Sequence, residues 1–192
     1  DLFRRFRFRF IVAPALLGTA CLFAAFYNIH ALILASVAWA IWHALMQTYG
    51  FIRIYAAKAG ETSAFDRRLD FSVCFLWFSG AILLNENPLM LMLSRWYRCG
   101  GFLIPASWID SLQGIWWGLL AIATGLWIVR LGFGYVRGAP PSPVKLLVTV
   151  SSIGFYWFAY SIAGNILVGA AMFEVFHDVQ YLAIVWLFNR RR

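Results

Sequence analysis

Ionisable side chains lie in the middle of the last apolar stretch of this sequence, where a charged group is costly. The run contains Glu174, His177 and Asp178, followed by Gln180 and Tyr181. Acidic and imidazole side chains inside a membrane segment usually face the bundle interior and pair with one another. Spacings of three and four residues place Glu174, His177 and Tyr181 on one side of a helix. Gln180 shares this side, and Asp178 lies at its edge.

A second apolar helix carries polar groups at a similar depth. On it, His43, Gln47 and Gly50 follow the spacing of four and seven residues that defines one helix face. A glycine on this face would let another helix or a ligand approach closely. We expect the two helices to run in the same direction, with His43 and His177 at the same depth in the membrane.

These residue types indicate metal chemistry. Imidazole and carboxylate groups together are common ligands of zinc, iron and manganese. The expected metal ligands are His43, His177 and Glu174. Gln47 and Gln180 are expected to support them, either by orienting a histidine or by binding a cofactor through their amide groups.

The acidic and phenolic groups of this cluster are the expected catalytic residues, namely Glu174, Asp178 and Tyr181. A bound metal would activate water or oxygen. Other chemistry fits the same residues. Two histidines could hold a haem from both sides, one could ligate the magnesium of a chlorophyll, and the acids could pass protons. A lone membrane histidine is more often a packing residue, so the prediction depends on the whole cluster.

Composition identifies the class of protein. The chain is 62% hydrophobic and 12% charged, whereas soluble domains are about 25% charged. We therefore predict an all-α integral membrane protein. The formal net charge of +8 could suggest nucleic-acid binding, but the basic residues cluster at helix ends, so topology explains them better and no nucleic-acid partner is expected.

A membrane-spanning helix needs about 20 apolar residues, which divides the chain into six expected spans. The run 146–189 is too long for one span, so we place a break at 163–165. Residues 89–98 are expected to form an interfacial helix. The sequence begins with Asp1, so an upstream segment could be missing. The expected spans, in a single domain covering residues 1–192, are 10–27, 31–57, 71–84, 112–135, 146–163 and 166–189.

The positions of the basic residues provide a test of the six-span arrangement. With the N-terminus inside, 14 of the 16 Lys and Arg side chains fall at cytoplasmic ends, as the positive-inside rule requires. Only Arg95 and Arg98 fall outside. We therefore expect both termini in the cytoplasm and a multi-pass location in a bacterial inner membrane. Arg53 is expected at the lipid headgroup level, where it could instead bind a lipid phosphate with Tyr49 and Tyr55.

Three functions fit these features. The first is a metal-dependent enzyme, an oxidoreductase or hydrolase, acting on a lipid-like substrate. The second is a non-catalytic subunit of a respiratory or photosynthetic complex that binds haem, chlorophyll or lipid. The third is a small proton-coupled transporter. The expected partners are membrane lipids, and either other membrane subunits or further copies of this chain. A P-loop, a nucleophile elbow and a Cys-x-x-Cys motif are absent from the sequence, which argues against nucleotide hydrolysis, a serine hydrolase and thiol redox chemistry.

Overall fold

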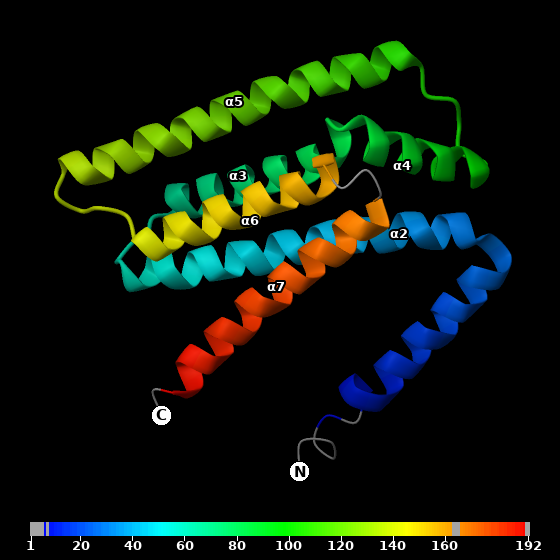
Figure 1. Cartoon of the computed structure of the whole chain (residues 1–192), viewed down its shortest axis with the longest axis horizontal. Helices are drawn as coiled ribbons and strands as arrows, with labels where there is room; N and C mark the ends of the chain where they lie inside the picture. The colour runs from blue at the N-terminus through cyan, green and yellow to red at the C-terminus, as the bar shows by residue number, and fades with distance from the viewer. Residues whose placement is uncertain (1–5, 7, 163–165, 191–192) are drawn as a thin grey trace. The chain divides into compact units, whose positions relative to one another are not determined.

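The computed structural model of this protein consists of helices joined by short connections in the residues it describes, which are 6, 8–162 and 166–190 (Figure 1). No strand occurs in these ranges, so the all-α prediction is confirmed. The expected break at 163–165 lies outside the described residues. The elements are a short π-helix η1 (Phe8–Val12) and the α-helices α2 (Ala13–Lys58), α3 (Ala64–Leu83), α4 (Glu86–Arg98), α5 (Ala106–Val136), α6 (Pro143–Ile162) and α7 (Ile166–Asn189).

The first two expected spans form one continuous helical stretch with a kink at Asn28. Asn28 has non-helical backbone angles, with φ −156° and ψ 82°. Its side-chain Oδ1 accepts a hydrogen bond of 3.0 Å from the backbone N–H of Ala31. This contact caps the helix that restarts there. The sequence boundary between 27 and 31 is therefore a helix kink rather than a loop.

Among the described residues, three helical segments are long and apolar enough to cross a membrane, namely Phe8–Lys58, Ala106–Val136 and Val168–Trp186. A fourth is added if α3 and α4, which are bent by 76° at a short break, form one broken span. The protein is therefore a helical membrane protein, and the expected count of six spans stays a prediction. The first segment has 51 residues, enough for two crossings at about 20 residues each.

Contacts within the chain group its residues into two compact units. Unit 1 comprises 1–39 and 92–103, and unit 2 comprises 40–91 and 104–192. In unit 1, His30 Nδ1 lies 3.1 Å from Arg95 Nη1, and the Cys99 thiol donates to Asn28 Oδ1 at 3.7 Å. These contacts join the kinked helix to the end of α4.

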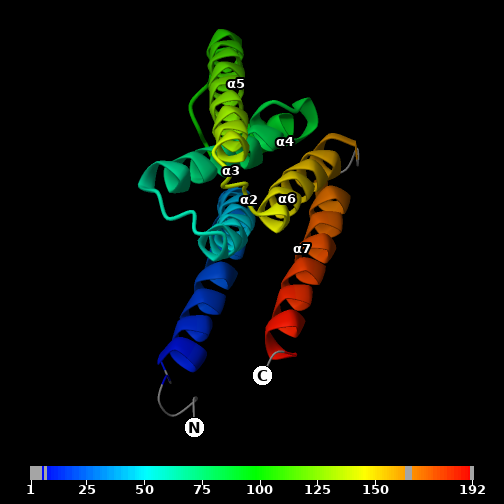
Figure 2. The ribbon, with the colours of Figure 1, turned by 90° about the vertical axis from the view of Figure 1, so that its left-hand side faces the viewer.

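Unit 2 is built around α3, which packs against both α5 and α6, while α6 packs against α7 (Figures 1 and 2). Its core contains stacked and edge-on aromatic rings. Phe78 on α3 lies 4.5 Å from Tyr156 on α6 and 6.1 Å from Phe173 on α7, measured between ring centroids. All three side chains are buried. Aromatic packing of this kind joins three helices at one point.

Indole groups join α3 to α5 and to α6 by hydrogen bonds. The Trp116 indole N–H donates to the Leu76 carbonyl at 3.0 Å, and the Trp157 N–H donates to the Trp77 carbonyl at 2.8 Å. The Trp77 N–H donates to Thr124 Oγ1 at 3.0 Å. Each of these half-buried rings thereby packs between helices with its one polar group satisfied.

The connection between α2 and α3 is short and well defined. Gly60 has φ +80°, a left-handed conformation that favours glycine after a helix end. Ser63 then caps α3, because its side-chain oxygen accepts a hydrogen bond from the Phe65 N–H. Glu61 lies between these two residues, so its position next to the start of α3 is fixed by the turn.

Replacing Phe78 with alanine should destabilise the protein strongly, because the ring is fully buried against two other aromatic rings. The expected loss is about 3–5 kcal/mol of unfolding free energy. Thermal unfolding in a mild detergent would measure it. Phe26→Ala is the matched control, since that ring is 88% exposed. A similar loss in both variants would contradict this assignment of the core.

Candidate functional site

The two histidines that were predicted to share a depth lie next to each other in unit 2. The rings of His43 on α2 and His177 on α7 have centroids 5.5 Å apart and meet edge-on, at an interplanar angle of 65°. His177 is 5% exposed, while His43 is exposed at the surface of the unit. The two polar segments identified from the sequence therefore come together in space.

Two carboxylates flank the buried histidine. His177 Nδ1 lies 3.9 Å from Glu174 Oε2 and 3.9 Å from Asp178 Oδ1. The possible ligand atoms of the three residues all lie within 4.8 Å of one another. Ligand atoms of a single ion lie no more than about 4.4 Å apart, because metal–nitrogen and metal–oxygen bonds are about 2.0–2.2 Å long. A small movement of the two exposed carboxylates would satisfy this limit.

Neither ring nitrogen of His177 has a hydrogen-bond partner among the described residues. A buried polar group without a partner costs about 1–3 kcal/mol. Packing alone would be served better by an apolar side chain at this position, since the ring is surrounded by groups such as Phe173, whose centroid lies 5.8 Å away. The imidazole is thus available to a ligand.

The carboxylates were predicted to face the bundle interior, but they are exposed. The Glu174 and Asp178 side chains are 55% and 74% exposed, and Tyr181 is 52% exposed. The reason is helix rotation: His177 and Phe173 occupy the packed side of α7, and the neighbouring positions turn away from it. These acids lie within Val168–Trp186, a segment apolar enough to cross a membrane.

Gln47 and Gln180, the two glutamines of the predicted site, differ in the hydrogen bonding of their amide groups. Gln180 is bound to Ser152 on α6, donating from Nε2 to the hydroxyl at 3.2 Å, so its amide is held toward α6. The Nε2 group of Gln47 is buried and has no hydrogen-bond partner in the described part of the chain. Of the two, Gln47 is therefore the one whose amide is open to a new contact.

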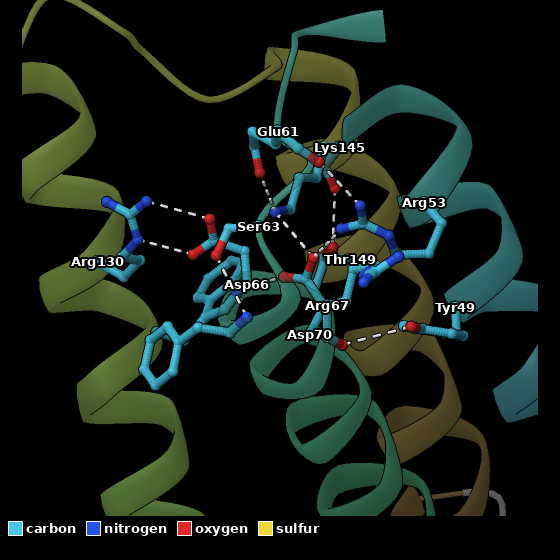
Figure 3. Close-up of polar contacts among 12 residues, drawn as sticks. Tyr49, Arg53, Glu61, Ser63, Asp66, Arg67, Asp70, Arg130, Lys145 and Thr149 are labelled. Carbon is cyan, nitrogen blue, oxygen red and sulfur yellow. Dashed lines mark hydrogen bonds and ion pairs between the residues drawn. The ribbon is translucent and has the colours of Figure 1, made fainter. Parts of the chain in front are cut away.

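A second cluster, which the sequence analysis did not identify, lies where α3 begins. Asp70 contacts Arg53 Nη1 at 3.1 Å and Lys145 Nζ at 3.0 Å (Figure 3). It also accepts a hydrogen bond of 3.1 Å from the Trp127 indole N–H. Lys145 also donates to Glu61 Oε2 at 2.6 Å. Both Asp70 and Lys145 are almost completely buried.

A further ion pair completes this cluster. Arg130 on α5 binds Asp66 through two hydrogen bonds, Nε to Oδ1 at 2.7 Å and Nη2 to Oδ2 at 3.1 Å (Figure 3). Bidentate pairs of this type are strong and directional. The cluster balances three acids, Glu61, Asp66 and Asp70, against three bases, Arg53, Arg130 and Lys145.

These side chains border a cavity of about 450 Å³, here called the charged cavity. Its walls come from residues 59–63, α3, α5, the α5–α6 connection and α6. The lining residues are Ala59, Gly60, Glu61, Thr62, Ser63, Asp66, Leu69, Asp70, Trp127, Arg130, Leu131, Gly134, Arg137, Ala139, Pro141 and Lys145.

The sequence contained a signal for this cluster. Asp66 and Asp70 are four residues apart at the start of a helix, amid basic residues that the positive-inside rule accounts for by themselves. Arg53, which was expected at the headgroup level, donates one N–H to Asp70 and another to the Glu61 carbonyl at 2.9 Å. Two of its donors are therefore used inside the protein rather than on a lipid phosphate.

The charged cavity and the histidine cluster are separate places on unit 2. His43 and Arg53 are ten positions apart on α2, which is about 15 Å along the helix axis at about 1.5 Å per residue. No residue of α7 lines the cavity in the described part of the chain. Comparison of this chain with models of protein families, with curated proteins and with solved structures found no match.

Replacing Asp70 with asparagine should destabilise the protein, because it leaves two cations beside an uncharged group in a buried place. Breaking a buried ion pair by removing one partner typically costs about 3–5 kcal/mol. Unfolding in detergent would measure the loss. Asp110→Asn, at an exposed position on α5, is the matched control and should change little. If the two variants were equally stable, the buried ion pairs would not hold these helices together.

Proposed function

We propose that unit 2 holds a transition metal at His43, His177 and Glu174, and that the protein is a membrane-embedded enzyme acting on a lipid-like substrate. One observation carries the proposal. His177 is buried without a hydrogen-bond partner among the described residues, beside a second histidine and two carboxylates at 3.9 Å. Imidazole and carboxylate ligands suit zinc, iron or manganese.

Charge supports a metal at this place. Glu174 and Asp178 lie in an apolar segment of membrane-spanning length, and their only ion-pair contacts among the described residues are with His177. Ionised groups in the hydrocarbon region are costly unless they are paired or serve a site. A divalent cation bound between these carboxylates and the two imidazoles would neutralise them.

The depth of the cluster favours a lipid-like substrate. His43 lies about 15 Å along α2 from Arg53, and half of a hydrocarbon core of about 30 Å is also about 15 Å. With Arg53 near the membrane surface, the metal would lie close to the bilayer centre, beside acyl or prenyl chains. The bound metal would supply Lewis acidity or activate water or oxygen.

The protein's own groups would complete the site. Asp178 and Tyr181 are exposed on the same stretch of α7, where they could donate or accept protons from a substrate that approaches through the lipid. The buried amide of Gln47 could orient a ligand from α2, while Gln180 is held by Ser152. The Gln47 amide would then act as a supporting group that holds a metal ligand in position.

A second function is favoured by the same exposed face. Two acids and a tyrosine on the outside of α7 would also be explained if another subunit, or a second copy of this chain, covered them. The protein would then be a haem-, chlorophyll- or lipid-binding subunit of a larger membrane complex. A proton-coupled transporter, in which the acids pass protons, is the third possibility.

The metal proposal is tested by metal analysis and absorption spectra of protein purified in mild detergent. We expect near-stoichiometric iron, zinc or manganese, with no haem or chlorophyll band. His43→Ala and His177→Ala should each lose most of the metal, because each removes one ligand. His30→Ala is the matched control, since His30 lies in unit 1 beside Arg95, and it should keep the full metal content.

A pigment band that disappears in either variant would instead support the cofactor-binding subunit. Protein with neither metal nor pigment would contradict both proposals and leave the proton-coupled transporter as the remaining function.

We also propose a multi-pass location in a bacterial inner membrane with both termini in the cytoplasm. A reporter enzyme fused after Arg192 should then be active only as a cytoplasmic reporter, because the basic residues concentrate at the ends assigned to that side. A fusion after Arg98, one of the two basic residues assigned outside, serves as the control and should report the opposite side. A periplasmic signal after Arg192 would show that the span count is wrong.

A further inference from the structure

We propose that the charged cavity binds a zwitterionic phosphate head group, one that carries a phosphate and a primary amine. The cavity is separate from the histidine cluster, so this proposal does not depend on the metal. It rests on three features of the lining: its size, its charged groups of both signs, and the polar atoms that the ion pairs leave without a partner.

The cavity is large enough for such a ligand. Pockets that bind small molecules usually have volumes of about 300–1,000 Å³, and this one has about 450 Å³. It is bordered by a fixed turn on one side, at Gly60 and Ser63, and by the α5–α6 connection, where Gly138 has φ +69°. Defined turns on two sides provide a preformed space.

The lining carries charges of both signs. It contains three acids, Glu61, Asp66 and Asp70, and three bases, Arg130, Arg137 and Lys145. Arg53 binds Asp70 from outside the lining, so the surroundings carry one net positive charge, which attracts an anion. A ligand that carries both charges can place its phosphate near the arginines and its amine near Glu61, so the mixed lining favours a zwitterion.

Arginine donors in the lining remain available for a phosphate. Arg130 uses two of its five N–H donors on Asp66, and its side chain is 40% exposed. Arg137 is exposed, and among the described residues it has no acidic partner; its guanidinium lies 5.9 Å from the Phe133 ring. Arginine suits phosphate because its planar group can donate two parallel hydrogen bonds.

An acceptor in the same lining remains available for an amine. Glu61 Oε2 binds Lys145, but Glu61 Oε1 is buried and has no hydrogen-bond partner in the described ranges. A buried carboxylate oxygen without a donor is costly, and an ammonium group supplies up to three donors. The hydroxyl groups of Thr62 and Ser63 also line the cavity.

A purely structural role for the charged residues around the cavity explains only some of these features. Clamping the helices together explains why Asp70, Lys145 and Arg53 are buried as a group. It does not explain why Arg137 lines the cavity without an acidic partner, or why one oxygen of Glu61 is left without a donor. A head group with a phosphate and an amine would satisfy both.

The ligand could come from a lipid or from solution, and native mass spectrometry of the full chain in detergent can distinguish them. The probes are phosphatidylethanolamine, phosphatidylglycerol, phosphatidylcholine and free phosphoethanolamine. We expect phosphatidylethanolamine to bind at least tenfold more tightly than phosphatidylglycerol, which has no amine. It should also exceed phosphatidylcholine, whose quaternary amine cannot donate a hydrogen bond to Glu61. Binding of free phosphoethanolamine without the lipid would identify a soluble ligand of the same chemistry.

Arg137→Gln should weaken the binding of the preferred amine-containing probe at least tenfold while leaving the melting temperature unchanged, because its side chain is exposed and outside the ion pairs. Arg68→Gln is the matched control: Arg68 is an exposed arginine on α3 that does not line the charged cavity, so binding should be unaltered. The proposal is overturned if all three lipids bind equally and free phosphoethanolamine does not bind. Equal loss in both arginine variants would overturn it too, as would no loss in Arg137→Gln.

Discussion

The ammonium group of Lys145 is buried between two carboxylates, and this contact fixes how three helices meet. The Lys145 side chain is buried, with Glu61 Oε2 at 2.6 Å and Asp70 Oδ2 at 3.0 Å. Asp70 in turn requires Arg53, so α6, α3 and α2 must meet at one place. A shift of any of these helices would leave a buried charge without a partner, at a cost of about 3–5 kcal/mol. The histidine cluster depends on this constraint, because His43 is on α2 and His177 is on α7, which packs against α6.

Much of the helical arrangement could be predicted from apolar segment lengths, because a membrane fixes how long a spanning helix must be. The same reasoning predicted that His43 and His177 share a depth, and the rings do lie 5.5 Å apart. Segment lengths did not predict which side of α7 faces the protein. Apolar residues occur all around this helix, so its sequence does not mark the side that faces the protein. The packed side is set by Phe173 and His177 against their neighbours, which leaves Glu174 and Asp178 outward.

The charged cluster could not be assembled from the sequence for a different reason. Arg53, Asp70 and Lys145 are on three different helices, and only the meeting of α2, α3 and α6 brings them together. Basic residues at helix ends also satisfy the positive-inside rule without any partner, so topology explained them sufficiently. The acidic residues, rather than the basic ones, marked the position of the cluster in the sequence. Glu61, Asp66 and Asp70 are three of only eight acidic residues, and they fall within one short stretch.

The two clusters differ in how their acids are compensated, and the difference indicates which acids lack a counter-charge. The cluster around Asp70 is balanced by the chain itself, three acids against three bases. The cluster on α7 has two carboxylates that meet only an imidazole among the described residues. Unbalanced charge is more costly deep in a membrane than at its surface, because the dielectric constant is lower there. The acids on α7 lie in a segment apolar enough to cross a membrane, where unbalanced charge is costly. The uncompensated acids therefore favour a cation or a partner supplied from outside the chain.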